Sequence, residues 1–110
     1  MTAELDPEDA KIVTLARSTR ARNRAAEGAA VRDATGRTYA AATVALPSLN
    51  LSALEVAVAM AVSSGADRLE AAAVVSEATE LTDAAVAPAL DLKAGAVFLA
   101  APDGTVIARR

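Results

Sequence analysis

Three carboxylates in the C-terminal half of the chain are the first residues whose type and spacing could support chemistry. Glu77, Glu80 and Asp83 offer hard oxygen donors, which are ligands that Mg²⁺ accepts. Spacing alone does not define a metal cage, however, and a solvated loop leading into a helix N-terminus explains the same residues. The cluster therefore leaves two interpretations open, a weak cation site and an ordinary surface loop.

A serine and a glutamate near the middle of the chain have the spacing of a helix start. Ser52 and Glu55 stand three residues apart, as in a capping box, where each side chain accepts a hydrogen bond from the other residue's backbone N–H. The same pair could belong to an active site, but capping explains both residues without chemistry. The pattern predicts a helix from Ser52 to about Ser64 that stops at Gly65.

Three arginines recur at helical spacing in the N-terminal quarter. Arg17, Arg20 and Arg24 stand at i, i+3 and i+7, which places them on one face of a helix. An anion, an acidic protein or RNA could dock there, although the negative net charge weighs against RNA. The alternative is a solvated helix face whose positive charges complement the C-terminal end of the helix dipole.

Two residue types are missing altogether, because the 110 residues include no cysteine and no histidine. The chain therefore lacks the ligands that usually hold zinc, iron-sulfur clusters and haem, and it has no imidazole or thiolate for catalysis. We expect no metal and no cofactor. With a net charge of −3 and only two aromatic residues, Tyr39 and Phe98, we also expect no binding of nucleic acid.

The hydrophobic residues are numerous but are not arranged as a membrane segment. The longest clean apolar run in the middle of the chain, Val56 to Val62, is far shorter than the ~20 residues that a spanning helix needs. The acidic start of the chain does not resemble a signal peptide. We therefore expect no membrane segment and a cytoplasmic location. The Val56 to Val62 run is apolar on every side, which predicts a centrally buried helix.

The length fits one domain, residues 1–110, and helices alternate with strands in the order α-β-β-α-β-α-β-β. This order predicts an α/β fold, a three-layer α/β/α sandwich. A loop containing Pro47 and Asn50 is expected before the second helix, and Pro88 is expected to kink or shorten the third. The expected elements are a helix from Pro7 that fades between Arg20 and Ala26, strands over 28–33 and 38–44, a helix over 52–64, a strand over 69–76, a helix over 82–91, and strands over 96–101 and 105–108.

Several strings resemble the cytidine deaminase family. Gly28-Ala-Ala-Val31 is similar to the family's first strand, and an Asp…Gly-Arg-x-Tyr hairpin turn follows it. Ala61-Val-Ser-Ser-Gly65 resembles the end of the family's central helix, and Ala72-Ala-Val-Val-Ser76 resembles the next strand. Together these strings span most of the chain, and they imply the cytidine deaminase-like version of the sandwich.

The family's metal and catalytic positions do not carry the residues that its chemistry needs. Counted from Gly65, the first zinc ligand falls on Ser52 and the catalytic glutamate on Leu54, while Glu55 lies one position further. One position on a helix turns a side chain by about 100°. The other ligands come from a Pro-Cys-Gly-x-Cys motif, and here that place is taken by residues 82–86, which include Asp83 but no thiolate.

The substrate-binding positions differ as well. The family's Asn-x-Glu falls near Thr43 and Ala45, and the aromatic residue that stacks on the pyrimidine falls on Ala25. Thr43, with the polar loop residues Ser48 and Asn50, could still line a residual nucleoside pocket. As loop residues beside a proline, Ser48 and Asn50 need no ligand to explain them.

These substitutions predict a cytidine deaminase-like protein without catalysis, a binding or interaction module. The resemblance implies a homo-oligomer, either a dimer or a tetramer. Binding of a different protein is a further possibility that the sequence leaves open. One alternative is a sensor that binds a pyrimidine nucleoside or nucleotide weakly. The other is a non-zinc hydrolase, which requires two or three of Glu55, Glu77, Glu80 and Asp83 to converge in one pocket.

Overall fold

The computed structural model describes residues 5–110, and within them it contains three helices and seven strands. None of these helices has the length and apolar character that a membrane crossing requires. The elements are α1 (Pro7–Asn23), β1 (Gly28–Asp33), β2 (Thr38–Ala42), β3 (Val44–Leu46), β4 (Leu49–Leu51), α2 (Ala53–Ser63), β5 (Leu69–Val75), α3 (Asp83–Asp91), β6 (Ala96–Ala100) and β7 (Val106–Arg109).

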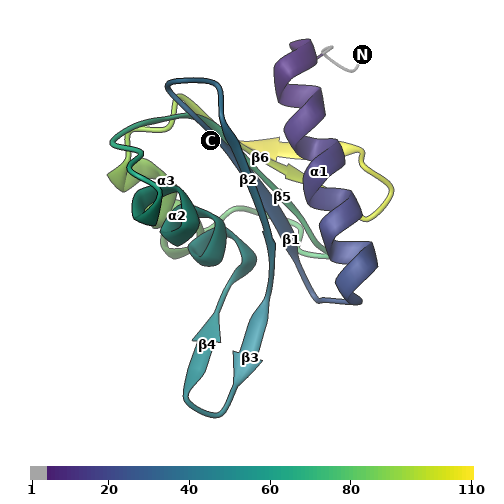
Figure 1. The fold of residues 1–110 in the computed structure, drawn as a ribbon. Helices are drawn as coiled ribbons and strands as arrows, with labels where there is room; N and C mark the ends of the chain where they lie inside the picture. The colour runs from purple at the N-terminus through teal and green to yellow at the C-terminus, as the bar shows by residue number, and fades with distance from the viewer. Residues whose placement is uncertain (1–4) are drawn as a thin grey trace.

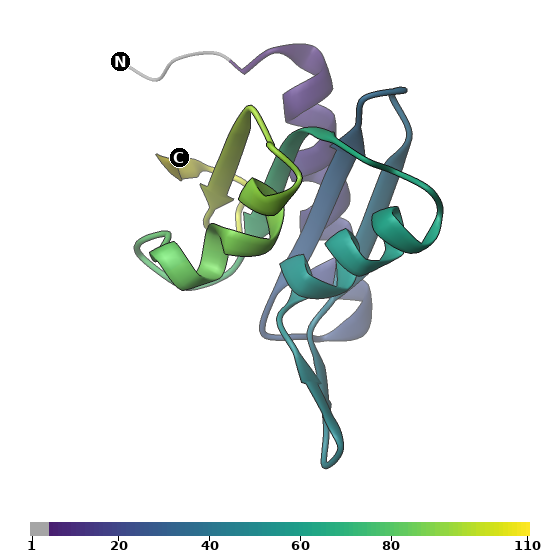
Figure 2. The same ribbon diagram turned by 90° about the vertical axis from the view of Figure 1, so that its left-hand side faces the viewer.

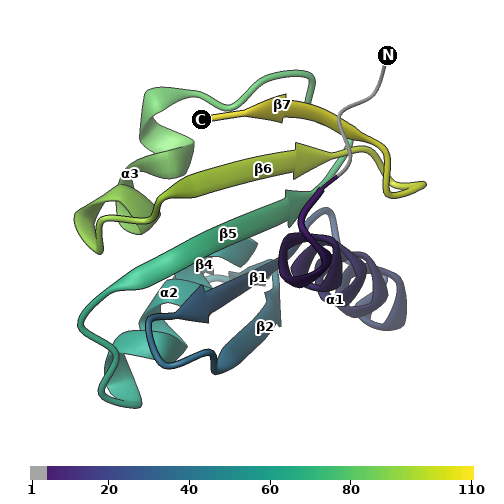
Figure 3. The same cartoon turned by 90° about the horizontal axis from the view of Figure 1, so that it is seen from above.

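A five-stranded sheet forms the middle layer, with the strand order β2-β1-β5-β6-β7. Strands β5 and β6 run parallel, and the other neighbouring pairs are antiparallel. Helix α1 covers one face of the sheet, while α2 and α3 lie side by side on the other (Figure 1 and Figure 3). The predicted three-layer α/β/α sandwich is confirmed.

Small side chains fill both faces of the sheet. Of the 110 residues, 31 are alanine, and the strands alternate their buried residues between the two faces. On the α1 face Phe98 is the largest buried side chain, and it is 2% exposed. The core on the α1 face contains Ile12, Val13, Ala16, Ala30, Ala71, Ala73, Val75, Ala96, Phe98 and Ala100; Ala29, Val31, Ala72, Val74, Val97 and Leu99 of the strands face α2 and α3.

A very close contact between layers lies where α1 crosses the start of β1. A Cβ atom added to Gly28 would clash with the backbone carbonyl oxygen of Ala16 and would stand 2.8 Å from Cβ of Arg20. Real Cβ atoms do not approach other heavy atoms so closely, so only glycine fits at this position. The absent side chain lets the helix backbone rest directly on the strand.

A half-buried arginine joins three elements at the other end of β1. Arg32 donates from Nε to Glu70 of β5 at 2.8 Å and from Nη2 to Asp9 of α1 at 2.9 Å. Burial by itself lowers the pKa of the Arg32 guanidinium, but the hydrogen bonds to Glu70 and Asp9 outweigh burial and raise that pKa above its ordinary value. Arg32 therefore stays charged and fixes α1 against the sheet.

The helix starts follow the local signals in the sequence. Asp6 accepts a hydrogen bond from the Glu8 N–H at 2.8 Å, with Pro7 at the first helical position. Thr82 likewise accepts from the Ala85 N–H at 3.1 Å and starts α3. Pro88 was expected to kink α3 or to shorten it. It lies inside the helix, which continues to Asp91, so the proline does not shorten α3.

Helix α2 differs from its prediction, because it is not buried on every side. Ala57 and Ala61 are fully buried against the sheet, but Met60 is 40% exposed and Val62 is 50% exposed. The sheet covers only one face of the helix, and α3 covers part of a second. The expectation of central burial within one chain is therefore wrong, and an apolar strip of α2 faces outward.

A short hairpin replaces the loop that was expected before α2. Strand β3 pairs antiparallel with β4, and Ala45 stands opposite Asn50. The hairpin projects away from the sandwich (Figure 1 and Figure 2), with Leu46 57% exposed and Leu49 48% exposed beside the turn. We call β3 and β4 with their turn the β3–β4 arm.

The contact at Gly28 predicts a large effect from one methyl group. We expect Gly28→Ala to lower the free energy of unfolding by about 3 kcal/mol, because either α1 or β1 must shift to admit the side chain. Urea denaturation of the purified variant measures this change.

Gly36→Ala is the matched control. Gly36 has φ +91° but nothing within 4 Å of an added Cβ, so this substitution adds backbone strain of only about 1 to 2 kcal/mol without a clash. Equal losses at the two positions would contradict the proposed close contact at Gly28.

Candidate functional site

Some of the positions that the resemblance assigns to the family's active site, Ser52, Leu54 and Ala85, line a small cavity. It lies at the N-terminal end of α2 and the carboxyl end of β5. Its volume is about 50 Å³, enough for a water molecule or two and well below the ~300 Å³ at which small-molecule pockets begin. The lining residues are Glu27, Ser52, Leu54, Val74, Ser76, Ala78, Glu80, Leu81, Ala85 and Leu99.

Three backbone N–H groups at the start of α2 donate to side chains of the same chain. Ser52 Oγ accepts from the Glu55 N–H at 3.0 Å, and Glu55 Oε1 accepts from the Ser52 N–H at 2.7 Å. The predicted capping box is thus confirmed. In addition, Glu27 Oε1 accepts from the Ala53 N–H at 3.2 Å. A carboxylate at this end also complements the positive end of the helix dipole.

Glu27 is held in place by Thr43, one of the residues expected at the former substrate site. The Thr43 N–H donates to the Glu27 carbonyl at 3.2 Å, and the Glu27 N–H donates to Thr43 Oγ1 at 2.9 Å. Sequence reasoning missed Glu27, because it lies in the α1–β1 connection, far from Ala53 in the chain. The only local signal for Glu27 was its position directly before Gly28, where β1 begins. This position places Glu27 at the edge of the sheet, beside the start of α2.

Leu54 takes the expected catalytic position, and Glu55 takes the position after it. Leu54 is 2% exposed and points into the cavity, whereas Glu55 is exposed and turns back to Ser52. A leucine side chain has no proton to give or accept, so the side chain at this position cannot act as a general acid or base.

The four acidic residues considered for a carboxylate site do not converge. Asp83 forms an ion pair with Arg110 at 2.7 Å and is 95% exposed, Glu55 caps α2, and Glu77 is exposed. Glu80 alone of the four lines the cavity. Across residues 5–110, no three His, Cys, Asp or Glu side chains gather so that they could hold a metal ion.

The residues around the cavity also do not fit the family's zinc ion. The hydroxyl of Ser52 is engaged as the helix cap, Leu54 offers no donor atom, and Asp83 points toward Arg110. Zinc sites of this kind use thiolate and imidazole ligands, and the chain contains neither.

The remaining positions assigned to the former substrate site are spread out. Ala45 and Asn50 pair with each other on the exposed β3–β4 arm, and Ser48 is exposed in its turn. None of these three residues lines the cavity at α2. Ala25 is half-buried in the α1–β1 connection. Only Thr43 stays close to the cavity, through its contact with Glu27.

The three arginines do not form the single face that their spacing predicted. Arg17 Nε donates to the Pro102 carbonyl at 3.1 Å, and Arg20 Nε donates to the Ala26 carbonyl at 3.1 Å. Arg24 lies just beyond α1, with φ +50°, because the helix ends at Asn23. Arg17 and Arg20 thus fasten neighbouring loops to α1, and Arg24 belongs to the helix end.

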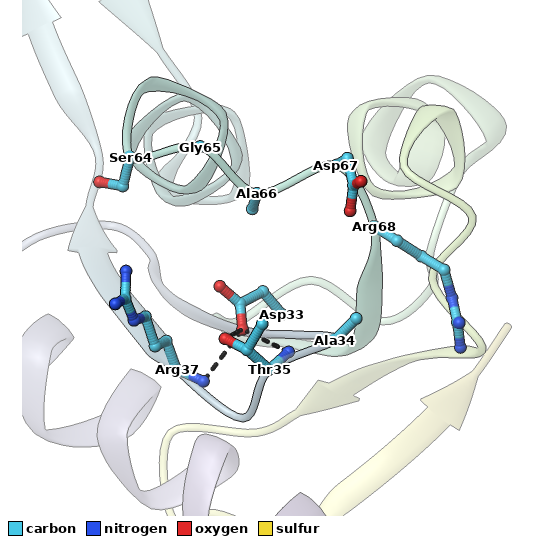
Figure 4. Close-up of a pocket in the computed structure, with 9 residues that line it drawn as sticks. All are labelled: Asp33, Ala34, Thr35, Arg37, Ser64, Gly65, Ala66, Asp67 and Arg68. Atoms are coloured by element: carbon cyan, nitrogen blue, oxygen red, sulfur yellow. Dashed lines mark hydrogen bonds between the residues drawn. The ribbon is translucent and has the colours of Figure 1, made fainter.

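A second and larger cavity opens at the opposite end of α2, between the β1–β2 turn and the α2–β5 connection (Figure 4). Its volume is about 440 Å³. Sequence reasoning did not find it, because two loops from separate parts of the chain form its walls. The lining residues are Asp33, Ala34, Thr35, Arg37, Ser64, Gly65, Ala66, Asp67 and Arg68.

Asp33 organises the β1–β2 turn on one side of this larger cavity. The residue is 4% exposed; its Oδ1 accepts from the Thr35 hydroxyl at 2.7 Å and from the Arg37 N–H at 3.0 Å, and its Oδ2 accepts from the Tyr39 hydroxyl at 3.0 Å. The Thr35 hydroxyl makes the largest contribution to lowering the pKa of Asp33, and the other donors lower it further. The Asp33 carboxylate is therefore ionised near neutral pH.

The comparison with known proteins agrees with this fold. A family model described as cytidine deaminase-like matches residues 5–104. The chain therefore belongs to the cytidine deaminase-like family. A search of curated proteins gave no match.

Glu27 provides a direct test of how the α2 N-terminus is satisfied. We expect Glu27→Ala to lower the free energy of unfolding by about 1 kcal/mol, because the Ala53 N–H loses its acceptor and the helix dipole loses a negative charge. Glu27→Gln keeps an acceptor and should lose about half as much. Glu80→Ala, at an exposed residue of the same cavity, should change the value by less than ~0.5 kcal/mol.

Asp33 predicts a pH dependence of stability. Because its pKa is lower in the folded chain than the ordinary 3.8, its stabilising effect is complete above about pH 4 to 5 and disappears as the pH falls through the folded pKa. Chemical denaturation between pH 2.5 and 7 should show a shallower acid loss for Asp33→Asn than for the wild type. Thr35→Val, which removes the strongest donor, should give an intermediate curve; identical curves for all three proteins would refute the assignment.

Proposed function

We propose that this protein is a non-catalytic cytidine deaminase-like protein, a pseudoenzyme that acts as a cytoplasmic binding or interaction module and assembles as a homo-oligomer. The observation that carries the proposal is the state of the α2 N-terminus. The Ala53 and Glu55 N–H groups donate to Glu27 and Ser52, and Leu54 lines the small cavity in front of them.

The chemistry of deamination supports the loss of catalysis. The zinc-dependent reaction needs a metal that activates water and a glutamate that moves the proton. The chain offers no cysteine or histidine for the metal, and the resemblance places Leu54 where the glutamate would stand. The cavity of about 50 Å³ is also too small for a nucleoside without movement of its walls.

Two exposed apolar features support assembly with a second copy. Met60 and Val62 face outward from α2, and Leu46 and Leu49 are exposed on the β3–β4 arm. From Thr38 to Ala66, Glu55 is the only charged residue. A nearly uncharged apolar surface can pack against its own copy across a two-fold axis, because no like charges are brought together.

The assembly is tested by measuring the molar mass in solution with light scattering or sedimentation equilibrium. We expect the wild type to form a dimer or tetramer. We expect Met60→Lys to raise the dissociation constant at least about tenfold, because each substitution appears twice in a symmetric interface. Ile107→Lys is the matched control, since Ile107 is 47% exposed on β7, at a far edge of the sheet.

A monomeric wild type, or an unchanged mass for Met60→Lys, would contradict the proposed assembly. The loss of catalysis is tested separately by incubating the protein with Zn²⁺ and cytidine. We expect neither one zinc ion per chain nor release of ammonia, and finding both would overturn the proposal. A thermal shift that only pyrimidine nucleosides produce would favour the nucleoside sensor instead.

A further inference from the structure

Two opposite charges line the larger cavity without meeting. Arg37 lies along one wall and Asp67 along the other, while Arg68 extends away from the opening (Figure 4). In the part of the chain that the structure describes, neither the Arg37 guanidinium nor the Asp67 carboxylate forms an ion pair or a side-chain hydrogen bond. By contrast, Arg32 and Arg110 are each paired with a carboxylate.

The walls that carry these charges are held by internal hydrogen bonds. The Ala34 N–H donates to the Arg68 carbonyl at 3.1 Å and thereby joins the two loops. Asp33 fixes the β1–β2 turn, and the Ala66 N–H donates to the Ala61 carbonyl at 2.9 Å, which ends α2 in a defined conformation. A site with fixed walls loses little conformational entropy when a ligand binds.

The electric field in the cavity has a direction. The C-terminal end of α2 carries the negative end of the helix dipole, and Asp67 follows it in the chain, so this side favours a cation. On the opposite wall the Asp33 carboxylate is buried and already accepts from the Thr35 and Tyr39 hydroxyls and the Arg37 N–H, so the Arg37 guanidinium is the exposed charge there. A guanidinium binds a carboxylate through two parallel hydrogen bonds. The volume of about 440 Å³ lies within the range of small-molecule sites.

We propose that this cavity binds a small zwitterion that carries an amine and a carboxylate, with its carboxylate on Arg37 and its amine on Asp67. The site is separate from the cavity at the α2 N-terminus and does not depend on the loss of catalysis there. A ligand with both charges would form an ion pair with Arg37 and another with Asp67, two side chains that do not pair with each other.

The test is a nuclear magnetic resonance titration of the full chain, labelled with ¹⁵N, against glycine, 4-aminobutyrate and 6-aminohexanoate. We expect saturable shift changes confined to residues 33–37 and 64–68 with at least one of the three. Butyrate and butylamine, which carry one charge each, should bind at least about tenfold more weakly, because each loses one charge-assisted contact.

Substitutions assign the two charges. Arg37→Gln and Asp67→Asn should each weaken binding at least about tenfold. The control variants Arg22→Gln and Asp91→Asn change exposed residues of α1 and α3 outside the cavity and should leave binding unchanged. The proposal is overturned by the absence of saturable shifts, by equal binding of butyrate, or by full affinity in Arg37→Gln or Asp67→Asn.

Discussion

The rest of the structure depends on the direct contact between α1 and β1 at Gly28. A core with one phenylalanine and many alanines cannot be stabilised by a few large side chains, so its layers must lie close enough for many weak dispersion contacts. Gly28 permits this approach on the α1 face, and Arg32 secures the other end of the same strand. The position of β1 in turn determines where Glu27 and Asp33 lie. Glu27 lines the cavity at the N-terminus of α2, and Asp33 lines the larger cavity at its C-terminus.

Helix α2 connects the two cavities and has a different role at each end. At its N-terminus, side chains of the same chain accept from the Ala53 and Glu55 N–H groups, and little space remains. At its C-terminus the chain turns away through Gly65, and an open, polar cavity follows. In this member of the family, the larger of these two cavities lies at the C-terminal end of α2. The positions that correspond to the family's catalytic centre lie at the other end of the helix.

The sequence was sufficient for features that depend on near neighbours in the chain. The starts of all three helices follow from Asp6 with Pro7, from Ser52 with Glu55, and from Thr82, since a cap needs only residues within one turn. The outward strip of α2 could not be predicted, because a helix that is apolar all round has no periodicity to show which face is covered. Glu27 and the larger cavity arise from loops that meet only in the folded chain.

The central place of β5 has a consequence for the way the chain acquires its structure. Strand β1 lies between β2 and β5, and Ala30 pairs with Ala73, so α1 and the β1–β2 hairpin come well before the strand that completes their sheet. Such distant pairings slow folding, because a long loop must close before its contacts are gained. During synthesis on the ribosome, α1 and the β1–β2 hairpin would therefore expose their alanine-rich faces until β5 emerges. Until β5 is available, these exposed faces make the nascent chain vulnerable to aggregation.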